Sequence, residues 1–139
     1  MGRAAKEGGE AETRAGETGV SAVLAAATAF NLVCLGATFI GDIKKENESP
    51  FIQTFRIDLD AQRWCAGNCE TTSRIFSVSD TMIMLKLEHD KEAGDESFIS
   101  LNRENGVILD RTRFNHQFFS MKTGTCERVP FTGFPAKRF

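Results

Sequence analysis

The chain has 139 residues, of which 41% are hydrophobic, and this length supports one domain with a substantial core but not two. Its 17 Lys and Arg and 19 Asp and Glu give a formal net charge of -2, and the two signs are interspersed along the sequence. No surface is therefore expected to carry the positive field that binds nucleic acid or an anionic membrane. Twelve Phe and no Tyr predict a core of rings that need no hydrogen-bond partner.

The N-terminal region is predicted to lie outside the folded domain. Residues 1–19 are small and charged, with no large apolar side chain to bury, so we expect them to be disordered. Residues 20–29 form a short apolar run that ends in Ala-Thr-Ala at 27–29. This is the length of a signal-peptide core followed by a small-x-small cleavage site. We therefore expect cleavage after Ala29 and a mature chain that begins at Phe30.

Two alternatives to a cleaved signal remain open. Residues 20–41 are long enough to cross a bilayer as an uncleaved anchor, since Asn31 is their only strongly polar residue. A cytosolic protein is the other alternative, because residues 1–19 are long and slightly acidic where a signal peptide begins with a short basic region. A start site placed too far upstream would also explain this flank.

The region after the signal-like segment consists of short alternating stretches, which are typical of half-buried strands. A first strand is expected over 30–40, where β-branched residues are frequent. In residues 50–60 the side chains of Phe55, Ile57 and Leu59 fall on one face. The charged residues between them face water, as in antiparallel sheets with one wet face.

Two further strands are expected in the middle of the chain. Residues 74–78 form a short strand with Phe76 and Val78 inward. Residues 81–88 alternate more clearly, so that Leu87 and the other apolar residues at odd positions share a buried face. Both strands are half-buried in this interpretation.

A hairpin is expected near the C-terminal third of the chain. Strands over 97–101 and 107–113 flank residues 102–106. Asn105 and Gly106 supply the positive φ values of a hairpin turn.

The remaining segments are a loop, a strand and a tail. Residues 89–96 form a charged loop that cannot bury itself, and residues 117–122 form a last strand. Residues 130–139 are interrupted by Pro and Gly and have no regular structure, although their Phe side chains need a surface to lie on.

No segment has a convincing helical period, so the fold class is all-β. We expect a single antiparallel sandwich or a small up-and-down barrel of about seven strands, connected as a meander. The domain spans residues 30–139 and follows a disordered extension plus signal-like segment over 1–29.

The four cysteines are expected to form two disulfides. Cys65 and Cys69 flank a three-residue turn that can bring them within disulfide distance. Cys34 on the first strand and Cys126 at the end of the last strand would join the edges that a closing meander brings together. Zinc is the alternative, with Cys65, Cys69, Cys126 and His116 as ligands, but the C-x3-C spacing is looser than in a zinc knuckle.

No catalytic, cofactor-binding or metal-binding residue is predicted. His89 lies in a charged loop and His116 beside a hairpin, where solvated histidines are common. Asp58 and Asp60 are typical of a wet sheet face with cross-strand partners. The same interpretation holds for Asp110, Arg111 and Arg113. Phosphate-binding loops, nucleophile elbows and metalloprotease helices have no counterpart in the sequence.

Several apolar residues are candidates for a partner surface. Trp64 stands next to Cys65 and is expected to pack on a disulfide rather than stack on a ligand. An adaptable apolar surface for a partner could instead combine the methionine pair with the Phe-rich tail. The candidate residues are Met82, Met84, Phe131, Phe134 and Phe139.

Four motifs of the chain carry a resemblance when they are taken together. They are FNLVCLG at 30–36, FRIDLD with RWC and Cys69, LNRENG at 101–106, and GTC followed by PFTGFP. This set resembles a family of short exported bacterial proteins of unknown function, over most of residues 30–139. The resemblance implies a signal peptide, a small β domain and paired cysteines, and it implies no activity. Asn105, where the family favours Thr, and the extended N-terminus depart from the pattern.

We expect a non-enzymatic binding or interaction module of the cell envelope, periplasmic or secreted, that binds an envelope protein or component. A membrane location is expected only if residues 20–41 are an uncleaved anchor. The alternative is a small barrel that carries an apolar ligand in its interior. A continuous apolar cavity above about 300 Å³ would favour the carrier, and a filled core would favour the interaction module.

Overall fold

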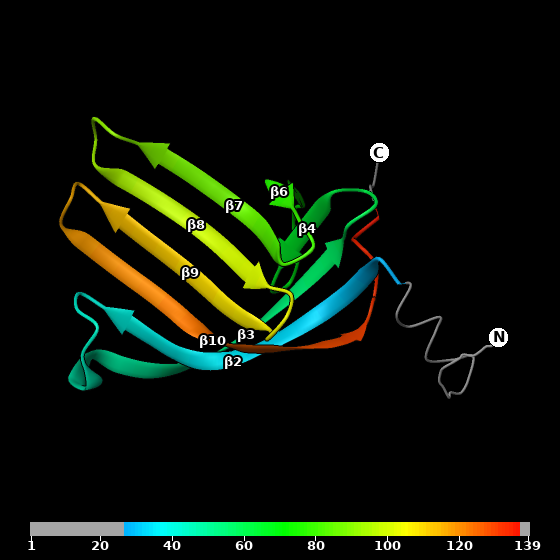
Figure 1. Cartoon of the computed structure of the whole chain (residues 1–139), viewed down its shortest axis with the longest axis horizontal. Helices are drawn as coiled ribbons and strands as arrows, with labels where there is room; N and C mark the ends of the chain where they lie inside the picture. Colours follow the sequence, from blue (N-terminus) through cyan, green and yellow to red (C-terminus); the bar gives the residue numbers. More distant parts are fainter. Residues whose placement is uncertain (1–26, 137–139) are drawn as a thin grey trace.

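The computed structural model describes residues 27–136, which form one antiparallel sheet of nine strands curled into a half-barrel (Figure 1). The all-β prediction is confirmed. The sheet has nine strands where about seven were expected. It is a single open layer, and it is therefore neither a sandwich nor a closed barrel. The elements are β2 (Ala29–Ile40), the 3-10 turn η2 (Lys45–Asn47), β3 (Glu48–Asp58), β4 (Arg63–Ala66), β5 (Ser73–Arg74), β6 (Ser77–Val78), β7 (Met82–Asp90), β8 (Asp95–Asn102), β9 (Val107–Phe114) and β10 (Phe118–Pro130).

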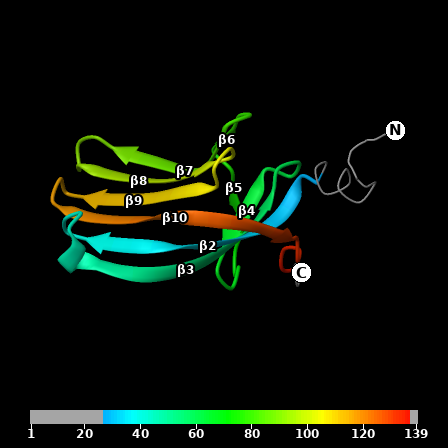
Figure 2. The same cartoon turned by 60° about the horizontal axis from the view of Figure 1, so that its bottom comes forward.

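The strand order is β5-β4-β3-β2-β10-β9-β8-β7-β6, so β2 and β10 pair in the middle of the sheet. Successive hairpins then run outward from this pair in both directions. The two edge strands, β5 and β6, are joined by Ile75 and Phe76. The Ile75 N–H donates to the Gln62 carbonyl (2.9 Å) and the Phe76 N–H donates to the Met84 carbonyl (3.0 Å). The chain itself therefore bridges the two sides of the sheet at one end, where Figure 2 shows β4, β5 and β6 gathered.

The core lies on the concave side of the sheet at this bridged end. Phe55, Ile57, Leu85 and Ile108 are among its most deeply buried side chains. We call the face that carries them the inner face. The buried core residues are Phe30, Leu32, Cys34, Phe55, Ile57, Trp64, Ile75, Ile83, Leu85, Ile99, Leu101 and Ile108.

Two glycines divide the sheet into a closed half and an open half. Gly36 on β2 lies directly opposite Gly124 on β10. A Cβ on Gly36 would lie 2.1 Å from the Thr123 carbonyl oxygen, and one on Gly124 would lie 2.0 Å from the Leu35 carbonyl oxygen. The two backbones approach too closely for any side chain. We call the part of the sheet on the Cys34 side the closed half, and the part on the side of the β2–β3 connection the open half.

The inner face of the open half is mainly polar. Cross-strand partners share a face, and one row runs across five strands. It consists of Thr38, Lys122, Asp110, Ile99 and Lys86. On the outer face, apolar side chains are exposed next to the boundary, where Leu35, on the Cys34 side of Gly36, lies opposite Ile52 at 56% and 70% exposure. In the row on the inner face of the open half, Ile99 is the one residue that belongs to the buried core.

A β-bulge in β7 changes the predicted pattern of that strand. The register shifts between Met84 and Lys86, so Leu85 has no partner on β8. An inserted residue reverses the alternation of faces. Ile83 and Leu85 are buried as predicted, whereas the inward prediction for Leu87 is wrong, and this side chain is 40% exposed.

The prediction of one strand over 74–78, with Phe76 and Val78 on the buried face, is also wrong. It is divided into β5 and β6, and the chain changes sides of the sheet between them. Ile75 is buried, while Phe76 is 59% exposed and Val78 is exposed as well. A segment that bridges two edges cannot keep the alternation of one strand.

The turns differ from the predictions in two places. The prediction of a charged loop over all of 89–96 is wrong, because β7 continues to Asp90 and β8 begins at Asp95. Gly106 has a positive φ of 75° as expected, but Asn105 does not, and the left-handed pair of residues is Asn115-His116 between β9 and β10. The Asn102 side-chain oxygen instead accepts bonds from the Glu104 and Asn105 N–H groups and shapes a longer loop.

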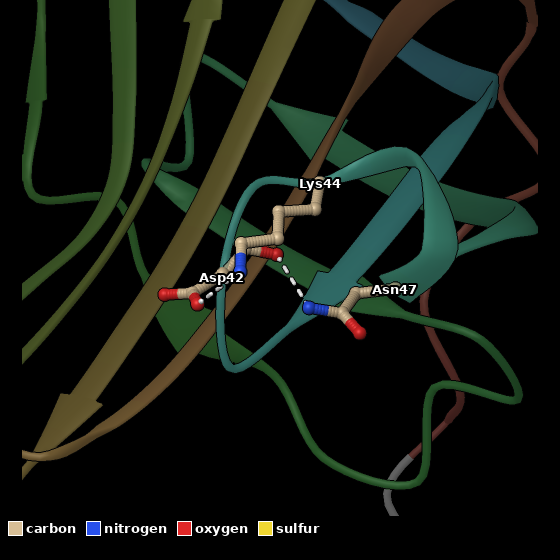
Figure 3. Close-up of polar contacts among 3 residues, drawn as sticks. All are labelled: Asp42, Lys44 and Asn47. Carbon is tan, nitrogen blue, oxygen red and sulfur yellow. Dashed lines mark hydrogen bonds and ion pairs between the residues drawn. The ribbon is translucent and has the colours of Figure 1, made fainter.

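The connection between β2 and β3 is held by polar contacts at the open end of the sheet (Figure 3). The Lys44 ammonium lies 3.4 Å from the Asp42 carboxylate. The Asn47 side-chain amide donates to the Asp42 carbonyl at 3.3 Å. These contacts close the loop around η2 without any buried side chain.

The described part of the chain includes the last residues of the signal-like segment. The Leu59 N–H donates to the Thr28 carbonyl (2.9 Å), and the Thr28 hydroxyl donates to Asp60 (2.8 Å). Ala29 is already paired with Asp58 in the sheet. Cleavage after Ala29 would remove these contacts. Residues 1–26, with most of the signal-like segment, lie outside the described residues.

Residues 29–40 form β2 rather than part of a spanning helix. Within residues 27–136 no helix is long and apolar enough to cross a membrane.

Candidate functional site

The disulfides pair the cysteines in the way that strand order predicts. Cys34 is bonded to Cys126 across the central strand pair, with their α-carbons 3.9 Å apart. Cys65 is bonded to Cys69 across the turn after β4, with a Cα–Cα distance of 5.1 Å. Disulfides persist in oxidising compartments, so the two bonds indicate a location outside the cytoplasm.

The four ligands of the alternative zinc site are not brought together. The cysteine sulfurs belong to two separate disulfides, and His116 lies in the exposed β9–β10 turn against Gly94. Within the described residues no group of three or more His, Cys, Asp or Glu side chains could hold a metal ion.

Trp64 lies in the core, as its packing interpretation predicts. Its side chain is 9% exposed, and its ring centroid is 6.1 Å from that of Phe55. The indole Nε1 is buried and has no hydrogen-bond partner within residues 27–136.

The residues predicted for a partner surface lie in two separate segments of the described chain. Phe131 and Phe134 pack edge to face at 5.2 Å in the segment after β10. That segment lies against β2 and β3, because Thr132 bonds to Asn31 and the Arg56 guanidinium donates to the Gly133 carbonyl. Met82 and Met84 lie on β7, several strands away in the sheet. Phe139 lies outside the described residues.

The histidines and the first carboxylate pair occupy peripheral positions. His89 is exposed on β7, and His116 is exposed in the β9–β10 turn. The Asp58 carboxylate accepts the Ala61 N–H (3.0 Å) and so stabilises the turn after β3. Asp60 is the acceptor of the Thr28 hydroxyl. The two carboxylates thus stabilise local structure at the end of β3.

The polar residues of β9 separate onto two faces of the sheet. On the outer face, Arg111 lies 5.6 Å over the ring of Phe119, and Arg113 pairs with Glu96 at 3.4 Å. Asp110 lies on the inner face, where burial raises the pKa of its carboxyl above the usual value. The ammonium groups of Lys122 and Lys86 act on this pKa in the opposite direction but do not cancel the effect of burial.

A cavity with an apolar floor and a polar rim lies at the far end of the closed half, and larger surface pockets lie beside Trp64 (about 430 Å³) and beside Gly36 (about 620 Å³). We call the first of these cavities the mouth pocket, and its volume is about 290 Å³. It lies between the start of β2, the end of β10 and the β8–β9 loop. Its floor consists of apolar core side chains, and its rim is polar. The lining residues are Ala27, Thr28, Phe30, Leu32, Leu59, Ile83, Leu101, Asn102, Arg103, Gly106, Cys126 and Arg128.

Hydrogen bonds fix the rim of the mouth pocket. The Arg103 N–H donates to the Thr81 carbonyl (2.8 Å), and its guanidinium donates to the Ser79 carbonyl (2.7 Å). The Cys126 N–H donates to the Gly106 carbonyl (2.8 Å), which ties the same loop to β10. Three hydrogen bonds to backbone carbonyls therefore hold the pocket wall in place.

The size of the mouth pocket bears on the carrier hypothesis. Its volume is slightly below the 300 Å³ that we required of a continuous interior cavity. Phe55, Ile57 and Leu85 fill the core beyond it. The structure thus has a shallow apolar pocket at one end of a filled core. The sequence did not reveal this site, because its walls come from five segments far apart in the chain.

Comparison of the chain with models of known protein families, with curated proteins and with solved structures gives no match in any of the three.

Proposed function

We propose that this protein is a non-enzymatic binding module of the cell envelope, periplasmic or secreted, that holds a small apolar group of an envelope component in the mouth pocket. The pocket carries this proposal. Ligand sites combine apolar walls with a few fixed polar groups, and the mouth pocket joins an apolar floor to a polar rim of similar extent. The two disulfides support a location outside the cytoplasm.

The chemistry of the lining supports binding rather than catalysis. The residues that line the mouth pocket include no carboxylate and no imidazole, and the one cysteine among them, Cys126, is bonded to Cys34. Asp110 has a raised pKa but lies on the open half, away from the pocket lining. Acid–base catalysis needs a titratable group within reach of the substrate.

A neutral apolar dye tests the proposal. N-phenyl-1-naphthylamine should fluoresce more strongly when it enters the pocket of the full chain. Ala27→Trp adds a large ring to the lining and should weaken dye binding about tenfold or more, because the ring occupies the space that the dye needs. Ala61→Trp, at an exposed turn position outside the lining, is the matched control and should bind as the original chain does.

Failure of the original chain to bind the dye, or equal binding by Ala27→Trp, would contradict the proposal. The outer face beside the Gly36–Gly124 pair, where Leu35 and Ile52 are exposed, would then be the better place to look for a protein partner.

A further inference from the structure

We infer that the group held in the mouth pocket carries an anionic head, so that the ligand is an amphipathic anion with an apolar body and a terminal carboxylate or phosphate. The inference rests on the proposed function for the apolar part of the ligand. The charged part comes from a separate observation, the position of Arg103 at the rim.

The charged side chains that line the mouth pocket are both positive. Arg103 enters from the β8–β9 loop and Arg128 from the end of β10. No Asp or Glu belongs to the lining among the described residues. A neutral apolar ligand would gain nothing from the Arg103 guanidinium at the rim, whereas an anion gains Coulomb attraction and charge-assisted hydrogen bonds.

Arg128 is positioned by an aromatic ring and a carbonyl. Its guanidinium lies 4.7 Å from the centroid of the Phe30 ring, and it donates to the Ala27 carbonyl at 2.9 Å. Phe30 is itself part of the pocket floor. The stacked arrangement therefore places the positive charge where the apolar floor meets the rim.

Arg103 is held in a similar way by the Ser79 carbonyl. A carbonyl fixes the direction of a guanidinium without cancelling its charge as a carboxylate would. The guanidinium has five N–H donors, and the bond to Ser79 uses one of them. Arg103 can thus bind an anion without first breaking an ion pair, and this lowers the cost of binding.

Matched ten-carbon probes separate the charged contribution from the apolar one. Calorimetry or displacement of the neutral dye should give an affinity for decanoate about tenfold higher than for decanol, since hydrogen bonds to charged groups are stronger than neutral ones. Decyltrimethylammonium should bind more weakly than decanol. The preference for decanoate should diminish at high salt, because screening acts on the charged head alone.

Variants of Arg103 connect the preference to the rim. Arg103→Gln should remove most of the preference for decanoate, measured as the ratio of decanoate affinity to decanol affinity in the same variant. Arg103→Lys should retain part of the preference, because it keeps the charge but loses the fork geometry. Arg74→Gln, on β5 and outside the lining, is the control for loss of a positive charge. Thermal midpoints check that each variant is folded.

Two sources of the ligand are distinguished by a vesicle arm. Binding of free decanoate that depends on Arg103 supports a soluble amphipathic anion. Binding only to vesicles that contain an anionic phospholipid, with the same dependence on Arg103, supports a membrane lipid headgroup. Equal affinity for decanoate and decanol would overturn the inference while leaving the proposed function in place. Loss of all binding, including that of the neutral dye, would overturn both.

Discussion

The closed and open halves share the same long strands but are stabilised in different ways. In the closed half the inner-face side chains meet one another across the curl and bury Phe55, Ile57 and Leu85. In the open half the corresponding positions carry Thr38, Lys122 and Asp110. Strand pairing and polar side-chain contacts, such as the Arg113–Glu96 ion pair, stabilise this part, whereas hydrophobic burial is the dominant favourable term in the other.

The difference shows that one continuous sheet can combine a core and an uncovered layer. The boundary is the Gly36–Gly124 pair, and the Cys34–Cys126 bond lies two residues into the closed half. Substitutions in the two halves should therefore change the free energy of unfolding by different amounts. Four predictions follow, from the largest expected effect to the smallest.

The largest effect is expected from the bond at the boundary. Cys34→Ala with Cys126→Ala opens a loop of sequence separation 92, and Cys65→Ala with Cys69→Ala opens one of 4. Loop entropy gives a loss of about 4.7 kcal/mol for the long bridge and about 2 kcal/mol for the short one. Chemical denaturation of the two double variants measures both losses. A larger loss for the short bridge would refute this ranking.

The next effect concerns the close approach of the central strands. Gly36→Ala places a Cβ 2.1 Å from the Thr123 carbonyl oxygen, and no side-chain rotation can relieve a contact with backbone. We expect a loss of about 3 kcal/mol in the free energy of unfolding. Leu35→Ala, next to it but exposed on the outer face, is the control and should change stability little. Equal midpoints for the two variants would mean that the strands can separate freely.

Two glycines with positive φ, one in each half, allow the stability of the two halves to be compared directly. Gly106, at the mouth pocket, has φ +75° and a Cβ there would lie 3.0 Å from the Cys126 carbonyl oxygen. Gly41, at the open end, has φ +92° and no atom within 4 Å of such a Cβ. Valine at either position is strained by about 1 kcal/mol. Gly106→Val should lower the free energy of unfolding more than Gly41→Val does, because its Cβ also meets the Cys126 carbonyl oxygen. Denaturant midpoints that are lower for Gly41→Val would contradict the comparison.

The smallest effect is a gain in stability within the open half. Burial raises the pKa of Asp110, so the folded state favours its protonated form. The protonated form contributes stability below the unfolded value of 3.8, and this contribution is lost as the pH rises through the higher folded pKa. Asp110→Asn should therefore raise the thermal midpoint at pH 7, with the gain shrinking as the pH falls toward 3.8.

Asp80→Asn removes the same charge at an exposed turn position and serves as the control for Asp110→Asn. A lower midpoint for Asp110→Asn at pH 7 would show that attraction to Lys122 and Lys86 outweighs burial.

The fold class and the cysteine pairs could be predicted because they depend on local patterns. Alternation at Phe55 and Ile57 is visible in any window of six residues, and both cysteine pairs follow once strand order is assumed. The bulge at Leu85 was not predictable, since a single inserted residue leaves the alternation in the sequence intact and changes only the pairing with β8. Ile75 was missed for a similar reason, because it belongs to a bridge between strands.

The mouth pocket was beyond sequence reasoning for a different reason. Arg103 was part of a turn motif, and Arg128 lay beyond the predicted last strand, which extends to Pro130 in the structure. Their proximity depends on the curl of the sheet. The one feature of the sequence that pointed to this site was an arginine between polar residues in the turn at 102–106. Such a composition is common in solvated loops, so it does not identify a binding site.

The pairing of β2 with β10 determines when the domain can fold during synthesis. A chain that emerges N-terminus first presents β2 and β3 early, but the partner on the other side of β2 comes from residues 118–130. Pairings between distant segments form slowly, because loop closure must precede the contacts that reward it. The sheet remains divided at its centre until the last strand is delivered.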